Sequence, residues 1–341
     1  MTCWENYHDV VAQMEQFGVQ FKDRDMPLAI DHPKRKGCGK GGKWWYWLRT
    51  FQVRGHAYIV GVFGSYKTGD SLKVDWRAPE LNAEDRARFA QERAQAEAAA
   101  IEARRRESEF AAGNARLQWS RGREAGSSPY LDRKGVQPEC CRYMPDGSIL
   151  IPLIRYDMPR ETALRAVQRI YPGPRSDSRT GEELPQKTFT KGFDPTGCAL
   201  RLGRVEHEGD LVMICEGYAT GLTVRMATNH RFAMFVGLSA GNLLSVAEIV
   251  RNLHPLSPIL VCADDDWKTR DHAGNLHNVG RKAAIECTKR LHDTHMTYPV
   301  WSGPRGDKAT DFNDLQASAG LDEVRKQLRT PIQWLQPDPR Q

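Results

Sequence analysis

Short apolar runs alternate with amphipathic segments throughout the second half of the chain. Buried strands are expected from the apolar runs at 211–215, 232–236 and 259–263, with a further short strand at 297–301. Helical spacing of apolar residues is found in the intervening segments, at 219–228, 243–252 and 280–291. Alternation of this kind is typical of a doubly wound parallel sheet. The pattern therefore predicts an α/β domain over residues 210–330.

The first 78 residues have a different pattern. Residues 1–30 place apolar side chains at helical spacing, which predicts one amphipathic helix. Three β segments joined by glycine-bearing turns follow at 44–54, 57–63 and 71–76. Residues 1–78 are therefore expected to form an N-terminal β-rich domain with a small antiparallel sheet.

The middle of the chain changes composition twice. Ala, Glu, Arg and Gln dominate residues 80–118, which predicts one long, lightly packed helix inside a linker at 79–122. A coiled coil stays an alternative there, although the heptad signal is poor. Beyond a Gly/Ser-rich stretch, β segments at 147–154, 164–171 and 187–191 indicate a small mixed α/β subdomain over 123–209. Residues 331–341 are expected to be a C-terminal tail.

Composition limits the class of protein. Hydrophobic residues make up 40% of the 341, the mean hydropathy is −0.60, and no apolar run has the length of a membrane span. We expect a cytoplasmic protein without a signal peptide or membrane association. The eight cysteines form no C-x-x-C pair, which argues against a zinc site and a disulfide framework.

The net charge of +6 is unevenly distributed. The excess of Lys and Arg falls within residues 1–78 and 123–209, upstream of the acidic residues considered below. This distribution would allow the first half of the chain to hold a polyanion that the second half processes. An ordinary solvated surface is the alternative explanation.

A basic, glycine-rich stretch at 34–43 precedes a cluster of aromatic residues. Residues 37–43 match G-x-x-x-x-G-K, but Trp44 replaces the Ser or Thr of a phosphate-binding P-loop and no apolar strand precedes it, so we reject that motif. The stretch could instead bind single-stranded DNA through phosphate contacts and base stacking. The candidate DNA-binding residues are Lys34, Arg35, Lys36, Lys40, Lys43, Trp44 and Trp45. Equally, it could be a loop entering a strand whose tryptophans belong to the core.

Two of the predicted strands end in acidic residues. Glu216-Gly217 follows the strand at 211–215, and Asp264-Asp265-Asp266 follows the strand at 259–263. Ligands of open α/β sheets bind beyond the carboxyl ends of the strands. Carboxylates gathered there repel one another, and a divalent cation with a preference for oxygen ligands, Mg²⁺ or Mn²⁺, would hold them together. A solvent-exposed turn is the usual alternative for an Asp triplet.

These acidic segments resemble the Toprim domain of DnaG-type primases, topoisomerases and certain nucleases. The similar segments are Glu216-Gly217, the Gly-rich turn at 236–242, the D-x-D of residues 264–266, Gly280-Arg-Lys-Ala-Ala284 and the acidic segment at 310–315. The order is most similar to that in primases of conjugative plasmids and phages, and segments at 62–69 and 128–135 extend the resemblance over residues 44–330. An insertion at 267–279 departs from the pattern.

The resemblance implies a DNA primase that makes short RNA primers on single-stranded DNA from NTPs, serving plasmid or phage replication or conjugation. It implies that Glu216, Asp264 and Asp266 are catalytic and, with Asp311 and Asp314, bind one or two Mg²⁺ or Mn²⁺ ions. Nucleotide or template would be held by Arg155, Arg169, Lys187, Lys191, Arg281 and Lys282. A replicative helicase is a further candidate partner. A Toprim-type nuclease and an inactive nucleic-acid-binding regulator remain alternatives, and Asp311 and Asp314 could simply cap a helix.

Overall fold

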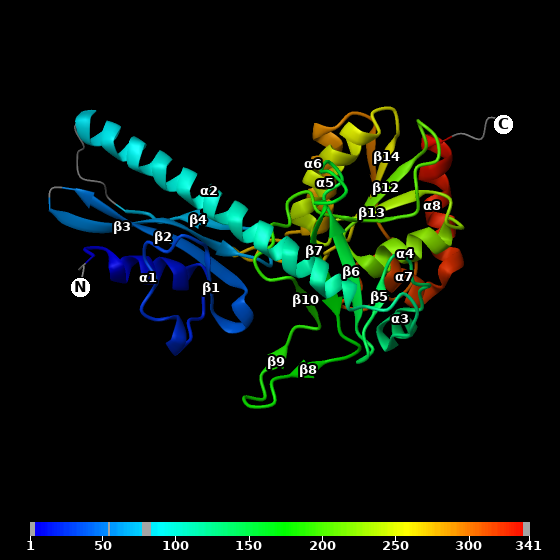
Figure 1. Cartoon of the computed structure of the whole chain (residues 1–341), viewed down its shortest axis with the longest axis horizontal. Helices are drawn as coiled ribbons and strands as arrows, with labels where there is room; N and C mark the ends of the chain where they lie inside the picture. The colour runs from blue at the N-terminus through cyan, green and yellow to red at the C-terminus, as the bar shows by residue number, and fades with distance from the viewer. Residues whose placement is uncertain (1–3, 54, 77–82, 337–341) are drawn as a thin grey trace. The chain divides into compact units, whose positions relative to one another are not determined.

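A computed structural model describes residues 4–53, 55–76 and 83–336 (Figure 1). The chain divides into two compact units by its internal contacts. The first comprises Met1–Arg105 and Thr269–His277, and the second comprises Arg106–Lys268 and Asn278–Gln341. The five-part division of the sequence stays a prediction.

The first unit contains a four-stranded antiparallel sheet in chain order. Its strands are β1 (Lys36–Cys38), β2 (Trp44–Val53), β3 (His56–Ser65) and β4 (Ser71–Lys73). The helix α1 (Tyr7–Gln16) contributes Val10 and Met14 to the same core as Leu48, Ile59 and Phe63. The small antiparallel sheet is thus confirmed, whereas the helix expected over 1–30 is limited to ten residues.

The insertion at 267–279 divides between the units. Thr269–His277 belongs to the first one, where the ring of His272 stacks on Phe17 at a centroid distance of 5.0 Å. His272 Nδ1 also lies 3.6 Å from a carboxylate oxygen of Asp70.

The long helix expected over 80–118 is confirmed as α2 (Ala83–Ser120). The second unit begins within it, at Arg106. Near its end Ala115 packs with Leu150 and Val167 of the small sheet described next. The buried Arg165 of that sheet adds an ion pair to the exposed Glu109 of the helix, at 2.8 Å. Small and charged residues therefore hold this end of α2, which explains why its sequence has no broad apolar stripe.

A small antiparallel sheet opens the second unit. Its order is β10 (Lys187–Phe189), β7 (Leu164–Ile170), β6 (Ile149–Ile154) and β5 (Arg142–Tyr143). The three longer strands were expected from the sequence. The sequence did not predict the short elements, because two to six residues are too few to show a period. The short elements are β5, α3 (Pro129–Lys134), and the hairpin of β8 (Arg175–Ser176) and β9 (Glu183–Leu184).

The predicted doubly wound sheet forms the rest of the second unit. Its order is β11 (Leu200–Leu202), β13 (Ala233–Val236), β12 (Val212–Cys215), β14 (Ile259–Cys262) and β15 (Thr294–Thr297). Strands β13, β12, β14 and β15 are parallel, and β11 pairs antiparallel with β13. The strand expected at 297–301 lies three residues earlier, because Pro299 lacks the amide hydrogen that a strand ladder needs.

Helices cover both faces of this sheet (Figure 1). They are α4 (Tyr218–Ala227), α5 (Leu243–Leu253), α6 (Val279–Arg290), α7 (Phe312–Ala319) and α8 (Leu321–Leu335). Met213 and Cys215 share a core with residues of α4, α7 and α8, whereas Val212 and Ile214 share one with residues of α5 and α6. Burial on both faces explains why the strands read as continuous apolar runs. Among the described residues, no helix is both long and apolar enough to cross a membrane.

A buried ion pair ties the segment before β5 to helix α4. Arg225 donates from Nε and Nη2 to the two oxygens of Glu139, at 3.0 and 2.8 Å, and His230 Nδ1 lies 3.0 Å from the same carboxylate. Burial alone would raise the pKa of Glu139, but the hydrogen bonds and charges of Arg225 and His230 outweigh it and lower this pKa.

We predict that Glu139→Gln lowers the free energy of unfolding by about 2 kcal/mol at pH 7, because Arg225 keeps its buried charge and loses its counter-ion. Since the folded-state pKa of Glu139 is lowered, its contribution is present above the unfolded pKa and is lost as the pH falls through the folded pKa. Denaturant unfolding at several pH values measures this. The control Glu286→Gln breaks an exposed pair with Arg290 and should cost little. Equal losses in both variants at pH 7 would contradict the prediction.

Candidate active site

Two strand ends place the acidic residues side by side. Strands β12 and β14 are parallel neighbours in which Cys215 pairs with Cys262, so Glu216 and Asp264 leave the sheet at the same edge. On its other side β12 pairs with β13, and that pairing continues past both strands, since Gly237 N donates to Cys215 O and Leu238 N to Glu216 O. The predicted convergence of these two segments is therefore confirmed.

The carboxylates lie in a poorly compensated environment. Burial, followed by the charge of Asp266, raises the pKa of Glu216 to about 7, although Lys187 opposes the shift. Burial and then the charges of Glu216 and Asp311 raise the pKa of Asp264 well above its usual value. The buried Oδ1 of Asp264 has no hydrogen-bond partner among the described residues. An unpartnered buried oxygen among repelling carboxylates fits a bound cation.

The cluster is not a closed metal cage. Over the described part of the chain, no three His, Cys, Asp or Glu side chains are arranged to enclose a metal ion by themselves. Mg²⁺ usually keeps several waters and takes only one or two carboxylates together with phosphate oxygens of a substrate. A cation at this place would therefore need waters or phosphate oxygens besides the carboxylates.

The middle residue of the Asp triplet has a structural role. Asp265 accepts from Arg305 Nη1 at 2.6 Å and from Asn278 Nδ2 at 2.6 Å, and Arg281 lies 3.7 Å away. Arg305 also donates to the backbone oxygen of Asp265 at 2.7 Å. The charge of Asp265 is thus compensated by arginines of this chain, which a cluster of mutually repelling carboxylates did not lead us to expect. Its neighbours Asp264 and Asp266 are left to face the cluster.

Gly280 fixes the geometry of the triplet against helix α6. Its amide donates to Asp266 Oδ2 at 2.9 Å, and a Cβ at this position would lie 2.4 Å from the backbone oxygen of Asp264. Asn278 caps the helix by accepting from Arg281 N and also accepts from Asp266 N, both at 3.1 Å. A glycine is required because helix and triplet approach at backbone distance.

Asp311 and Asp314 form the helix cap that the sequence left open as an alternative. Asp311 Oδ1 accepts from Asp314 N at 2.8 Å, and Asp314 Oδ2 accepts from Thr310 N at 2.9 Å. Asp311 Oδ2 also accepts from Thr220 Oγ1 at 2.8 Å. Burial and then Asp314 raise the pKa of Asp311, which itself raises that of Asp264. Asp311 therefore both caps helix α7 and belongs to the acidic cluster.

Two lysines face the acidic cluster. Desolvation by the surrounding protein, followed by the charge of nearby Lys134, lowers the pKa of Lys187, although the end of its side chain reaches solvent. The negative charges of Asp311, Glu216 and Asp264 oppose this shift. Lys134 Nζ lies 3.7 Å from Asp314 Oδ1. The sequence indicated Lys187 but missed Lys134, which ends the short helix α3. Lys191 is exposed beyond β10.

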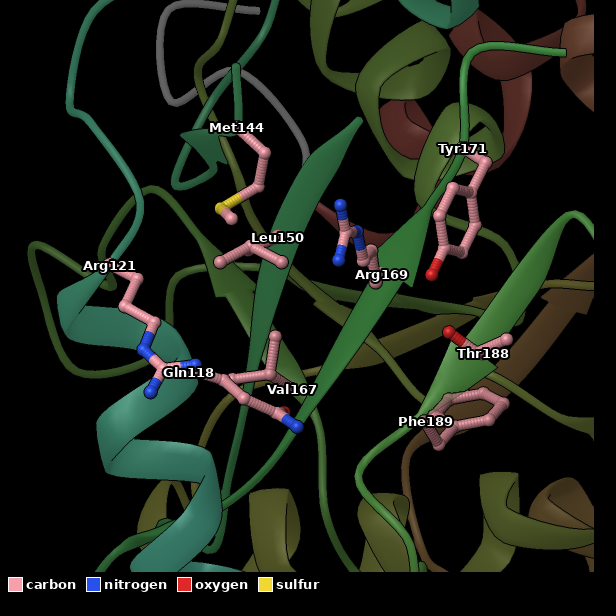
Figure 2. Close-up of a pocket in the computed structure, with 9 residues that line it drawn as sticks. All are labelled: Gln118, Arg121, Met144, Leu150, Val167, Arg169, Tyr171, Thr188 and Phe189. Carbon is pink, nitrogen blue, oxygen red and sulfur yellow. The ribbon is translucent and has the colours of Figure 1, made fainter. Parts of the chain in front are cut away.

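The predicted ligands Arg155 and Arg169 have partners of their own. Arg169 pairs with Thr188 across β7 and β10, so it lies on the opposite face of the small sheet from Lys187, which pairs with Ile170. Figure 2 shows Arg169 in a hollow on that face. Arg155 makes two hydrogen bonds to Asp157, at 2.8 and 2.6 Å. Neither arginine shares the Lys187 environment.

Among the remaining predicted ligands, Arg281 stays beside the Asp triplet. Arg281 is in the first turn of α6, with its guanidinium 4.0 Å from the ring centroid of Tyr298, and Lys282 is exposed. In the first unit Lys34, Arg35 and Lys43 are exposed, Lys36 is half-buried, and the side chain of Lys40 lies outside the described part. Trp45 is 7% exposed under the Arg35 guanidinium at 4.0 Å, and Trp44 packs against the core. A strand starts at Trp44 instead of a helix, which confirms that 37–43 is no P-loop.

Residues 211–322 match the Toprim domain family, and this segment of the chain is a Toprim domain. Its fold, a mixed α/β unit with a mainly parallel sheet, is the one that the sequence predicted.

The chain is similar to two Escherichia coli proteins named DNA primase TraC. One is 32% identical over 112 residues, 32% of this chain, and the other 27% identical over 150 residues, 43% of this chain. The chain spans only 10% of the length of each.

Solved structures give weaker likenesses. The primase fragment of the bacteriophage T7 primase-helicase protein is 15% identical, with 59% of this chain and 74% of that chain covered and a TM-score of 0.39. The Aquifex aeolicus primase is 12% identical, with 94% and 83% covered and a TM-score of 0.39.

We predict that the metal-free protein becomes less stable as the pH rises from 4.5 to about 7. The pKa of Glu216 is raised over this interval, so the folded protein holds a proton that the unfolded chain has lost. The loss is on the order of 2 kcal/mol. Added Mg²⁺ should restore stability more at pH 7.5 than at pH 5. Denaturant unfolding in chelator and in Mg²⁺ measures both effects.

Glu216→Gln removes the titrating group and should flatten this pH dependence and weaken the Mg²⁺ effect. The control Glu248→Gln changes an exposed carboxylate on α5 and should behave like the unchanged protein. Identical pH profiles for the two variants would exclude Glu216 as the source.

Proposed function

We propose that this chain is the catalytic part of a DNA primase, making short RNA primers on single-stranded DNA by metal-dependent nucleotidyl transfer from NTPs. The observation that carries the proposal is the acidic cluster of Glu216, Asp264 and Asp266 at the carboxyl edge of a Toprim sheet, with an unpartnered buried oxygen on Asp264. Part of the chain is similar to proteins named DNA primase. Plasmid or phage replication, or conjugation, is the proposed setting.

The residues in and around the cluster would have different roles, according to their surroundings. Glu216, Asp264 and Asp266 would hold one or two Mg²⁺ or Mn²⁺ ions, with Asp311 and Asp314 at the side of the cluster. Such ions, when bound, stabilise charge on the transferring phosphate and on the attacking and leaving oxygens. Lys187 and Lys134 would bind the triphosphate, since both ammonium groups lie beside the carboxylates. Asp265, Arg305 and Asn278 keep Asp264 and Asp266 oriented.

Template and partners are proposals of the same kind. The surplus of basic residues in 1–78 and 123–209 supports binding of a single-stranded DNA template, with Lys191, Arg281 and Lys282 as further contacts. A replicative helicase as partner and a cytoplasmic location follow from the proposed activity.

We predict that Asp264→Asn and Glu216→Gln each reduce primer synthesis by at least about a hundredfold, because the cation would lose an oxygen ligand at the reacting phosphate. The measurement follows labelled ribonucleotides on single-stranded DNA with Mg²⁺ or Mn²⁺, resolved on a gel. Controls are Glu248→Gln and Asp322→Asn, which change exposed carboxylates on α5 and α8.

The same gel separates the alternatives. Extended products support a primase, shortened DNA without nucleotide dependence indicates a Toprim-type nuclease, and unchanged DNA indicates a regulator that only binds. Full primer synthesis in both cluster variants would overturn the assignment of the site.

The basic stretch before β2 gives a second prediction. Replacing Lys34, Arg35 and Lys43 by Gln should weaken binding of single-stranded DNA and reduce the slope of log K against log salt by about 2, since each lost phosphate contact removes about 0.7. Fluorescence anisotropy at several salt concentrations measures the slope. The matched control replaces Arg24, Lys67 and Lys73, three other exposed cations of the first unit. If both triple variants lose the same slope, the stretch has no special role.

A further inference from the structure

One arginine joins the Asp triplet to the segment that carries Asp311. Arg305 donates from Nη1 to Asp265 Oδ2 at 2.6 Å and from Nη2 to the backbone oxygen of Asp265 at 2.7 Å. It also donates from Nε to the backbone oxygen of Ala309 at 2.9 Å. Every nitrogen of the guanidinium group therefore has an oxygen partner. Two of these oxygens belong to the triplet, and the third lies two residues before Asp311.

A backbone hydrogen bond connects the same two segments. Asp265 N donates to Thr310 O at 2.8 Å, which holds the residue in front of Asp311 against the middle of the triplet. The charge of Asp311 is among those that raise the pKa of Asp264, so the two carboxyl groups lie close together. The place of Asp311 in the acidic cluster therefore depends on the contacts of Asp265 and Arg305.

Two tryptophan rings lie against the guanidinium group of Arg305. Its central carbon is 4.9 Å from the ring centroid of Trp267 and 4.1 Å from that of Trp301. The Trp301 ring is fixed by a hydrogen bond from Nε1 to Ser318 Oγ, at 3.1 Å. Only 16% of the Arg305 side chain and 10% of that of Asp265 is exposed. Shielding from water strengthens the attraction within this ion pair, because charges interact more strongly where the effective dielectric constant is lower.

We propose that Arg305 is a positioning residue, which holds Asp311 at a fixed distance from Asp264 and thereby raises the affinity of the acidic cluster for Mg²⁺. It acts through Asp265 and Ala309 and does not itself bind the ion. The inference rests on the proposed metal site, and it adds to that site the residue that joins the Asp311 segment to the Asp triplet.

Repulsion among the carboxylates makes this link necessary. Like charges favour any movement that separates Asp264 from Asp311, and the segment 302–310 forms no helix or strand that would resist such a movement. With Arg305 in place, the two carboxylates are already together when the ion arrives. The affinity for the ion is then higher, because binding does not have to order the segment.

The contacts of Arg305 require the planar fork of a guanidinium group. Three nitrogens in one plane reach three separate oxygens, whereas a lysine has one ammonium group on a flexible stem. Arg305→Lys should therefore keep the positive charge and lose the link between Asp265 and Ala309. A role in charge compensation alone would tolerate this change.

Thermal unfolding of the full chain in increasing Mg²⁺ measures the affinity for the ion without nucleotides or DNA. We expect Arg305→Lys and Arg305→Ala each to raise the Mg²⁺ concentration that gives half of the stabilisation by about tenfold, as is usual when a residue that orients a metal ligand is lost. The control is Arg290→Lys, which changes an exposed arginine of α6 paired with Glu286 and should leave this concentration unchanged.

Free guanidinium gives a second readout. At concentrations far below those that unfold proteins, it should restore the Mg²⁺ affinity of Arg305→Ala, because it can occupy the space that the deleted side chain leaves beside the two tryptophan rings. It should not restore that of Arg305→Lys, whose side chain fills the space. If Arg305→Ala does not fold, the Mg²⁺ dependence of Arg305→Lys decides alone.

Failure of this inference is distinguishable from failure of the metal site. A stabilising effect of Mg²⁺ that is present in the unchanged protein and lost in Glu216→Gln establishes the site. A protein that Mg²⁺ does not stabilise overturns the site and this inference together. Once the site is established, the inference is overturned if the Arg305 variants need the same Mg²⁺ concentration as the control, even when their metal-free thermal midpoints are lower. Equal responses of the two variants to guanidinium would also overturn it.

Discussion

Repulsion between carboxylates at the edge of the parallel sheet is the constraint around which the second unit is arranged. The register of β12 and β14 brings Glu216 and Asp264 together, and burial makes their charges costly. A fold selected only for stability would not place unpartnered carboxylate oxygen there. Uncompensated carboxylates of this kind are typical of a site that binds a cation, because the cation supplies the positive charge that the surrounding protein does not.

Neighbouring acidic residues differ in how far their charges are compensated. Asp265 is neutralised by Arg305 and Asn278, whereas Asp264 on one side of it keeps a bare oxygen. The same Asn278 caps helix α6, and Gly280 permits the close approach of that helix. The triplet therefore combines Asp265, which is held by Arg305 and Asn278, with two acidic residues that face the cluster.

The small sheet separates two populations of basic residues. Alternation along β7 and β10 directs Lys187 to the acidic cluster and Arg169 to the hollow on the other face. Basic residues of this small sheet therefore lie on two separate surfaces, and only the surface with Lys187 faces the proposed catalytic site.

The sequence by itself determined the longer helices and strands and the acidic residues that meet at one edge of the parallel sheet. Buried strands of four residues or more produce apolar runs, and acidic residues at their ends stand out because a parallel sheet exposes that edge. Only the tertiary structure decided which acidic residues are free, which face each arginine occupies, and that Trp45 is buried. Those outcomes depend on partners distant in the chain, such as Arg305 for Asp265 and Asp146 for Arg169, and on strand register. The local pattern of apolar and polar residues indicates secondary structure and burial. It does not indicate which distant charged residue pairs with a given side chain.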